Sequence, residues 1–108
     1  MDLVEQVYLI CQKMPSQEIY VLTQQIKRCS ISIPSNIAEG YTRGRPKEIL
    51  QFLRISNGSA SELETQLLIS TRLKYLSVED TNPVLNGISS IQKQIQSLIK
   101  KIEQDDTA

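Results

Sequence analysis

The sequence predicts an all-α protein: an antiparallel up-down four-helix bundle that forms a single domain over residues 1–108. Three observations lead to this prediction. Apolar residues recur at steps of three and four in four segments, no segment alternates as a strand would, and only four glycines and four prolines are present. Connections between the helices must therefore be short. A chain of 108 residues is long enough for one domain with a modest core.

The first two helices are expected over about residues 2–14 and 17–40. The first has acidic residues in its first turn, where the helix dipole favours anions, and Pro15 ends it. Ser16 is a good N-cap for the second helix, and Glu18 lies in the first turn of that helix.

The second helix contains a proline in its apolar stripe. Ile33 and Ile37 keep the helical period on both sides of Pro34, so we expect a helix that is kinked there and not ended. Asn36 is placed to bond the backbone that the proline leaves free, or to make a functional contact. Gly40 suits the left-handed residue that closes a helix C-terminus.

The third and fourth helices are expected over about residues 46–75 and 83–103. Pro46 fits the first position of the third helix, and the asparagine and proline before position 84 mark the turn into the fourth. The fourth helix has isoleucine and leucine at steps of 3, 4, 3 and 4, which is a two-position heptad stripe. The acidic residues 104–108 are expected to be a frayed tail.

Composition argues against several classes of function. The chain has no histidine, which removes the usual general base and the usual metal ligand. No nucleotide loop, zinc spacing or nucleophile motif is present, so we expect no enzyme, cofactor, metal or small-molecule substrate. No run of about 18 apolar residues exists, and a cytoplasmic protein without a membrane span is expected. Cys11 and Cys29 lie among apolar residues and are expected to be buried free thiols.

Basic residues are concentrated in one part of a chain whose formal net charge is zero. Residues 27–47 hold five cations against the single acid Glu39, a local charge of +4. The candidates for contact with RNA or DNA phosphates are Lys27, Arg28, Arg43, Arg45 and Lys47. The alternative is a solvated helix end followed by a turn, and the neutral total argues against bulk attraction to nucleic acid.

More apolar residues are present than a monomeric bundle with one stripe per helix needs. The surplus lies outside the stripes of the second and third helices, at Val21, Ile31, Leu50, Leu68 and Ile69. Exposed apolar surface of this kind usually marks an interface. We therefore expect a homo-oligomer, and a ring is possible if the contact is heterologous and closes.

A long pattern covers most of the chain: P-x-x-E-x-Y-x-L-x-x-Q-x-x-R, then S-I-P-x-N-I-A-E-G, a basic turn, and F-L-x-x-x-x-G-S-x-x-E-L-E-T-Q-L. It falls on Pro15, Glu18, Tyr20, Leu22, Gln25, Arg28, Ser32 to Pro34, Asn36 to Gly40, Phe52, Leu53, Gly58, Ser59 and Glu62 to Leu67. With this pattern the sequence resembles the four-helix-bundle family of 23S rRNA intervening-sequence proteins.

The resemblance implies an antiparallel four-helix bundle that assembles into a homopentameric ring and has no known enzymatic activity. Some bacterial members are encoded inside insertions in 23S rRNA genes. A relative of the same fold, the accessory variability determinant of diversity-generating retroelements, is a basic ring that binds nucleic acid and a reverse transcriptase. This chain differs from that relative in being neutral. It also has Arg45 where family members usually have a small N-capping residue, so Thr42 or Gly44 is expected to begin the third helix instead.

Two hypotheses follow. The first is a non-catalytic oligomeric scaffold that contacts RNA or a nucleoprotein through a basic rim of the ring, which includes a role as accessory subunit of a reverse transcriptase. The second is a protein-only adaptor. In both, the residues expected to build subunit contacts or the fold are Pro34, Asn36, Glu39, Gly40, Gly58, Ser59 and Glu62.

Overall fold

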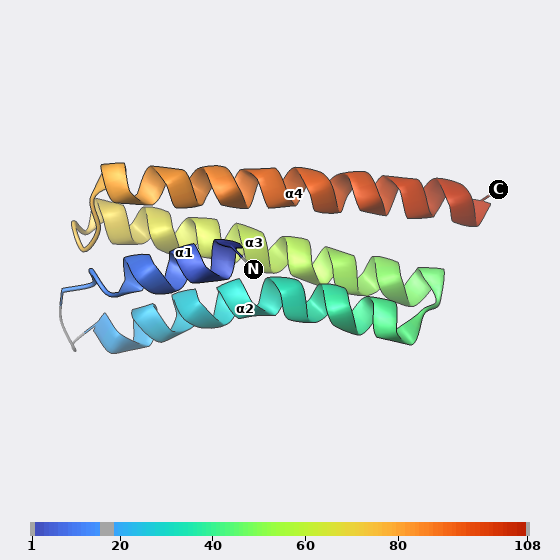
Figure 1. Cartoon of the computed structure of the whole chain (residues 1–108), viewed down its shortest axis with the longest axis horizontal. Coiled ribbons are helices and arrows are strands. Elements are labelled where there is room, and N and C mark those ends of the chain that lie inside the picture. Colours follow the sequence, from blue (N-terminus) through green and yellow to red (C-terminus); the bar gives the residue numbers. More distant parts are fainter. Residues whose placement is uncertain (1, 16–18, 108) are drawn as a thin grey trace.

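The computed structural model describes residues 2–15 and 19–107, with no strand among them (Figure 1). The predictions for Ser16 and Glu18 lie outside these residues. The four helices run antiparallel in sequence order and are α1 (Asp2–Cys11), α2 (Tyr20–Arg43), α3 (Pro46–Arg72) and α4 (Val78–Thr107). The predicted four-helix bundle is confirmed.

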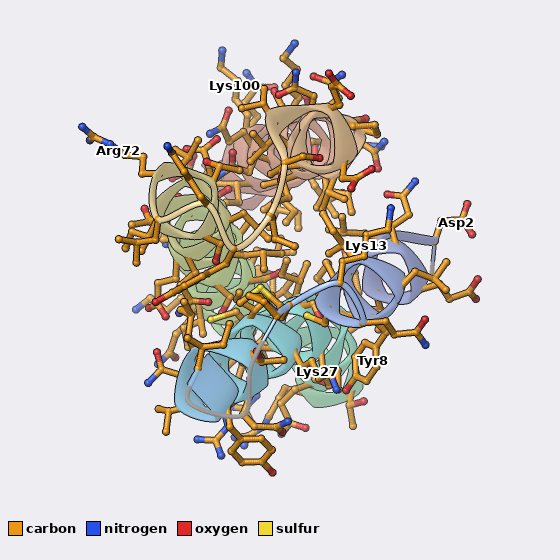
Figure 2. The ribbon with its side chains drawn as sticks, turned by 90° about the vertical axis from the view of Figure 1, so that its left-hand side faces the viewer. Asp2, Tyr8, Lys13, Lys27, Arg72 and Lys100 are labelled. Carbon is orange, nitrogen blue, oxygen red and sulfur yellow. The ribbon has the colours of Figure 1, made fainter. Side chains whose placement is uncertain are left out.

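The helices stand at the corners of a square, with α1 and α3 on one diagonal and α2 and α4 on the other (Figure 2). The α2–α3 contact is the most extensive one. The bundle measures 51 × 21 × 19 Å. Because α1 has only 10 residues, it covers only the half of the bundle near the α3–α4 turn (Figure 1). The other half contains α2, α3 and α4 alone.

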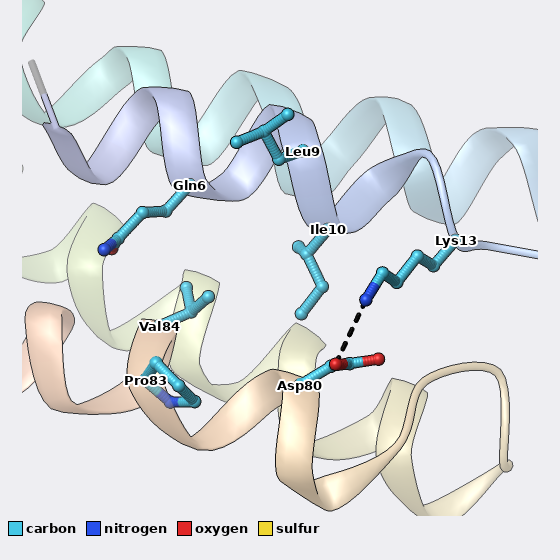
Figure 3. A pocket seen from close by; sticks show the side chains of 7 residues that line it. All are labelled: Gln6, Leu9, Ile10, Lys13, Asp80, Pro83 and Val84. Carbon is cyan, nitrogen blue, oxygen red and sulfur yellow. Dashed lines mark ion pairs between the residues drawn. The ribbon is translucent and has the colours of Figure 1, made fainter.

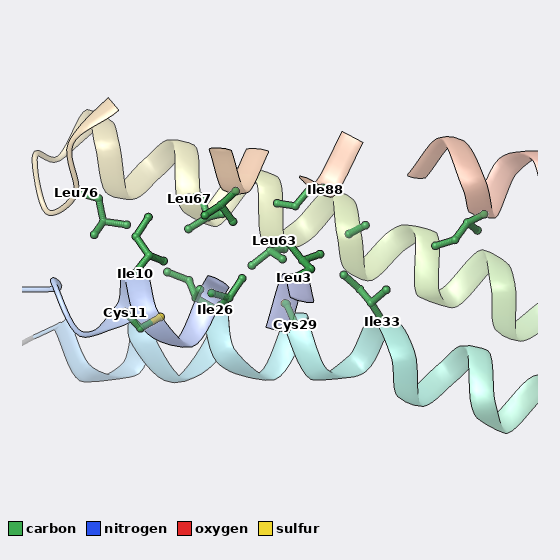
Figure 4. Close-up of a cluster of buried hydrophobic side chains, with 14 of the residues drawn as sticks. Leu3, Ile10, Cys11, Ile26, Cys29, Ile33, Leu63, Leu67, Leu76 and Ile88 are labelled. Carbon is green, nitrogen blue, oxygen red and sulfur yellow. The ribbon is translucent and has the colours of Figure 1, made fainter. Parts of the chain in front are cut away.

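A single apolar cluster fills the centre of the bundle (Figure 4). Its fully buried members come from all four helices: Val7, Ile26, Ile33, Leu53, Ala60, Leu63, Leu67 and Ile88. Burial of one such side chain stabilises the fold by about 1.5–3 kcal/mol. Leu50, expected among the surplus apolar residues, is also buried, so that expectation was wrong. The described helices include none long and apolar enough to cross a membrane.

Helix α2 passes through Pro34 and bends near its middle, as predicted (Figure 1). The helix then continues to Arg43, so the prediction that it ends at Gly40 was wrong. Gly44 is the left-handed residue instead, with φ of 81°, and its N–H bonds the Gly40 carbonyl at 3.2 Å. Gly40 is buried against α3, where an added Cβ would lie 2.9 Å from the Cβ of Phe52. The glycine serves close helix packing and not a turn.

Helix α3 begins at Pro46, as predicted, and ends at Arg72, three residues before the expected end. Lys74 follows in the left-handed conformation with φ of 65°. The Tyr75 N–H bonds the Ser70 carbonyl at 2.8 Å, and the Lys74 N–H bonds the Thr71 carbonyl at 3.0 Å. This is a Schellman motif with lysine where glycine is usual.

Helix α4 is longer than predicted at both ends. It starts at Val78 because the Ser77 hydroxyl accepts a hydrogen bond from the Asp80 N–H at 3.0 Å and caps the helix. Pro83 lies inside the helix, so its interpretation as a turn signal was wrong. The C-terminus is helical through Thr107, which corrects the predicted frayed tail over residues 104–108 as far as the structure describes it.

Candidate interaction surfaces

The α2–α3 turn holds three of the predicted phosphate contacts at one end of the bundle. Gly44 reverses the chain, Arg45 is the N-cap of α3 with extended backbone, and Pro46 opens the helix. Neither Thr42 nor Gly44 begins α3, so that expectation was wrong. Arg45 and Lys47 are exposed, and neither takes part in an ion pair within the described ranges. The Arg45 side chain makes no capping hydrogen bond.

Arg43 is held by contacts within its own subunit. Because α2 runs past Gly40, Glu39 and Arg43 lie one helical turn apart and pair at 3.0 Å. Glu39, one of the residues expected to build subunit contacts or the fold, therefore has a partner on its own helix. The Arg43 guanidinium also lies over the Phe52 ring, 5.3 Å from its centre. Arg43 is thus partly neutralised and less available to a phosphate than Arg45 or Lys47.

Lys27 and Arg28 are not at the turn. Fifteen residues separate Arg28 from Arg43 along α2, which corresponds to about 22 Å of helix. Lys27 lies over the Tyr8 ring of α1, 5.1 Å from its centre, in the half of the bundle that α1 covers. The five predicted cations therefore form two groups, one within α2 and one at the α2–α3 turn, and do not share one rim.

Acidic residues of α4 share the end of the bundle with the basic turn. Because α4 stays helical to Thr107, Glu103 and Asp105 are carried to the end where α2 meets α3 (Figure 1). Glu103 pairs with Arg54 of α3 at 2.8 Å. Arg54 lies outside residues 27–47, so this pair leaves the charge of the basic turn unchanged.

The seam between α2 and α3 carries a chain of polar contacts. The Asn36 side-chain amide donates to the Ser32 carbonyl at 2.8 Å and to the Ser32 hydroxyl at 2.9 Å. The Ser32 hydroxyl in turn lies 2.8 Å from that of Ser59. Inside the seam, the buried Ser56 hydroxyl donates to the Ile33 carbonyl beside Pro34 at 2.9 Å. Ser59 and Ser56 therefore join α3 to α2, whereas Asn36 bonds Ser32 of its own helix, one turn back.

Glu62 lies next to one of the two free cysteines. The Cys29 thiol donates to a Glu62 carboxylate oxygen, with a sulfur–oxygen distance of 3.6 Å. Burial raises the pKa of the Cys29 thiol, and the neighbouring carboxylate raises it further. Burial also raises the pKa of the Cys11 thiol. Both thiols are free and buried, as predicted.

The outer face of α3 carries two exposed isoleucines on one helical stripe. Ile55 and Ile69 are 44% and 42% exposed, and Gly58 and Glu62 lie between them on the same helical stripe. An added Cβ on Gly58 would meet no atom within 4 Å. Glycine costs a helix about 1 kcal/mol relative to alanine, and packing inside this subunit gives no reason for it.

A shallow cavity of about 220 Å³ lies between α1 and α4 (Figure 3). Leu9, Ile10 and Val84 line it together with an ion pair between Lys13 and Asp80 at 3.1 Å. The Lys13 ammonium and the Ser77 hydroxyl hold the pKa of the Asp80 carboxyl below its usual value. No group of three or more potential metal ligands occurs among the residues described.

The bundle and its turn can now be compared with known proteins. The model of one family, the 23S rRNA-intervening sequence proteins, matches residues 1–97. The chain belongs to that family. This family member is also similar to a crystal structure of a protein of unknown function from the S23 ribosomal protein family of Bacteroides thetaiotaomicron. The TM-score is 0.75 at 24% identity over 91% of this chain and 98% of the other, which supports the fold. No curated protein matches the chain.

Sequence reasoning about this family member missed a third surface, on α4. A cavity of about 380 Å³ lies along the helix and is lined by Lys93, Gln94, Ser97, Leu98 and Lys101. The signal was present in the sequence, because the predicted first helix, residues 2–14, is shorter than the predicted fourth helix, residues 83–103. An unequal pair of neighbouring helices leaves part of the longer one uncovered.

Proposed function

We propose that this intervening-sequence family protein is a non-catalytic scaffold that assembles from several copies of itself. The observation that supports this most is the outer face of α3. Ile55, Gly58 and Ile69 lie on one stripe there, with Glu62 and Thr65 between the last two. No contact inside the subunit explains the exposure of the two isoleucines or the presence of the glycine. Small residues on a helix allow close approach of a neighbouring helix, and an exposed apolar stripe favours burial. A closed ring of five copies is the form that the family resemblance implies.

The assembly is tested by measuring the mass of the full chain by light scattering and sedimentation at micromolar concentration. Ile55→Asp and Ile69→Asp are expected to reduce the mass to that of one copy while circular dichroism stays helical. Leu9→Asp is the matched control, because Leu9 is 62% exposed on α1, away from this face. A monomeric parent protein would contradict the proposal.

Gly58→Ala is a second test, and its two possible outcomes differ in their effects on assembly mass and on helix stability. If another copy packs against Gly58, the added methyl group weakens the assembly and lowers its mass at low concentration. If nothing packs there, alanine raises helix stability by about 1 kcal/mol and leaves the mass unchanged. The second result would remove the outer face of α3 from the interface.

A specific observation also favours contact with RNA. Arg45 stands at an N-cap, where serine or aspartate would satisfy a backbone N–H, and its side chain makes no capping bond. Positions that break a local rule without a compensating contact are often functional. We propose that Arg45 and Lys47, with less help from Arg43, contact phosphates. Lys27 and Arg28 would form a separate contact about 22 Å away along α2.

The test is a titration of the full chain with structured RNA, single-stranded RNA and duplex DNA across a range of salt concentrations. On single-stranded RNA, Arg45→Gln with Lys47→Gln is expected to reduce the salt slope by roughly 1.4, which is about 0.7 for each lost contact. The control is Arg72→Gln with Lys74→Gln at the other end of α3, about 39 Å away. Binding that is absent even at low salt would favour a protein-only adaptor, and pull-downs would then test a reverse transcriptase as partner.

A further inference from the structure

In the half of the bundle that α1 leaves open, α2 and α4 carry half-buried apolar side chains, and a cavity of about 380 Å³ lies along α4; we call this surface the groove. Helix α1 begins beside Gly87 of α4, where an added Cβ would lie 3.4 Å from Leu3 and from Gln6. Beyond that point α4 continues for about 20 residues and α2 for about 10 with no α1 between them (Figure 1). The uncovered part of α4 from Gly87 to Asp105 is about 27 Å long.

Burial along each helix changes where α1 stops. On α4, Val84 and Ile88 are buried beside α1, whereas three of the next four residues on the stripe, Ile91, Leu98 and Ile102, are only half-buried; Ile95, between them, stays buried against the core. On α2, Ile33 is fully buried and Ile37, one turn later, is half-buried. The apolar stripes therefore continue past the helix that covers them.

The α3 side chains that face this corner of the bundle do not contribute to its exposed apolar surface. Leu50 and Leu53 of α3 stay buried here, at 7% and 1% exposure. The open apolar surface thus belongs to α2 and α4, and Tyr41, 46% exposed, extends it at the α2 edge. This is the geometry of a site for a helix that lies along a groove.

Charge distinguishes the two edges of the groove. On the α4 side, Lys93 and Lys101 flank Leu98 around the cavity of about 380 Å³, and neither lysine forms an ion pair with a described residue. The single acid on this edge is Asp105 at the far end. The α2 edge, with Pro34, Ile37 and Tyr41, is uncharged. A ligand that fits must be apolar on one face and acidic along the edge that faces α4.

We propose that this groove binds an amphipathic helix of a partner protein, about four to five turns long, with leucine-like side chains at helical spacing and an acidic edge. Such a helix would continue the fourth corner of the bundle where α1 ends.

Other occupants fit this surface less well. A nucleic acid does not suit a surface whose base consists of apolar side chains. A second copy of this chain has its own short acidic helix, α1, already buried through Leu3, Val7 and Ile10. In the proposed function, copies of the chain associate through the outer face of α3, so the groove is a separate surface.

The test uses three synthetic 18-residue peptides and the full chain, with binding followed by fluorescence anisotropy. The first peptide has leucine at positions spaced by three and four and glutamate along one edge. The second has lysine in place of that glutamate, and the third has the composition of the first in scrambled order. The glutamate peptide is expected to bind at least tenfold more tightly than either of the others.

Variants of the protein decide whether binding occurs in the groove. Leu98→Asp is expected to abolish binding of the glutamate peptide. Lys93→Glu with Lys101→Glu is expected to reverse the preference, so that the lysine peptide binds more tightly, which an unfolded variant could not do. Lys100→Glu, on the outer face of α4, is the matched control and should change affinity less than threefold.

Several outcomes would overturn the proposal. These are no binding of the glutamate peptide up to about 1 mM, equal binding of the scrambled peptide, or no reversal in the double variant. A loss of assembly mass in Leu98→Asp without any peptide binding would show that the groove contacts a second copy instead. Neither the RNA titration nor the mass of the α3 variants bears on these results, so this proposal and the proposed function can fail separately.

Discussion

At the scale of single residues, two glycines of this chain have opposite surroundings. Gly40 is buried where α2 meets α3, and a methyl group there would come within 3.3 Å of the Ile49 backbone. Gly58 is exposed and an added methyl group would meet nothing. Both lie inside long helices, so helix propensity treats them alike. Only the position of the neighbouring helix shows that Gly40 is needed for packing within the subunit and that Gly58 is available for contact with another subunit.

Gly40→Ala is therefore expected to destabilise the protein by about 1 kcal/mol. Overpacking against the Cβ of Phe52 costs about 1–3 kcal/mol, which outweighs the gain of about 1 kcal/mol in helix propensity. Denaturant unfolding followed by circular dichroism measures the change. Ser35→Ala on the exposed side of the same helix is the control and should be neutral or slightly stabilising. An increase in stability for Gly40→Ala would show that α3 can move away without loss.

Lys74→Gly is expected to raise stability by up to about 1 kcal/mol. A side chain in the left-handed conformation is strained by roughly 1–2 kcal/mol, and glycine removes that strain while losing some entropy on folding. Thermal unfolding should show a midpoint higher by a few degrees. Lys74→Ala removes the same charge but keeps the strain, so it should leave the midpoint near that of the parent. Equal shifts in both variants would assign the effect to charge.

At the scale of the helices, the main errors of sequence reasoning concern helix ends. Proline was taken to mark the start of α4, yet Pro83 is the sixth residue of the helix because Ser77 caps it earlier. Glycine was taken to end α2 at Gly40, but Gly44 does so four residues later. In both cases two residues could have ended or begun the helix. The Ser77 cap decided the start of α4, and packing of Gly40 against α3 accompanies the continuation of α2.

Arg45→Ser separates the role of this position in the fold from its role in binding. Serine at the N-cap is expected to stabilise α3 by about 0.5–1 kcal/mol because its hydroxyl can accept a backbone N–H. The same change removes a proposed phosphate contact and should weaken RNA binding. Denaturant unfolding and an RNA titration on one preparation measure the two effects. Arg45→Ala serves as control, with weaker binding and no gain in stability. A serine variant that binds RNA as the parent does would remove Arg45 from the contact.

At the scale of the whole molecule, the bundle has two unequal halves. The half near the α3–α4 turn is a four-helix bundle, and the other half has three helices (Figure 1). The two groups of cations, one within α2 and one at the α2–α3 turn, fall in different halves. The basic turn also shares its end of the bundle with the acidic end of α4. The separation of the two groups of cations and the nearness of the acidic end of α4 to the basic turn depend on how the helices pack.

Amide hydrogen exchange is expected to distinguish the two halves. Within α4, residues 94–103 should exchange faster than residues 81–90, because α1 covers only the second range and local stability follows packing. Mass spectrometry of peptides from the full chain at low concentration measures this difference. The glutamate peptide described above should slow exchange over residues 94–103 only. Equal protection along α4 in the free protein would mean that the open half is already covered in solution.

Sequence alone determined the number of helices, their order, most of the core and the presence of surplus apolar surface. It could do so because spacing at three and four residues is a local property of the chain. The tertiary structure alone decided where the cations lie, since Lys27 and Arg28 lie within α2, far from the α2–α3 turn that holds the other three. It also decided that Gly40 packs against α3 and that a groove remains beyond α1. Each of these depends on distances between residues far apart in the sequence, which are set when the helices pack.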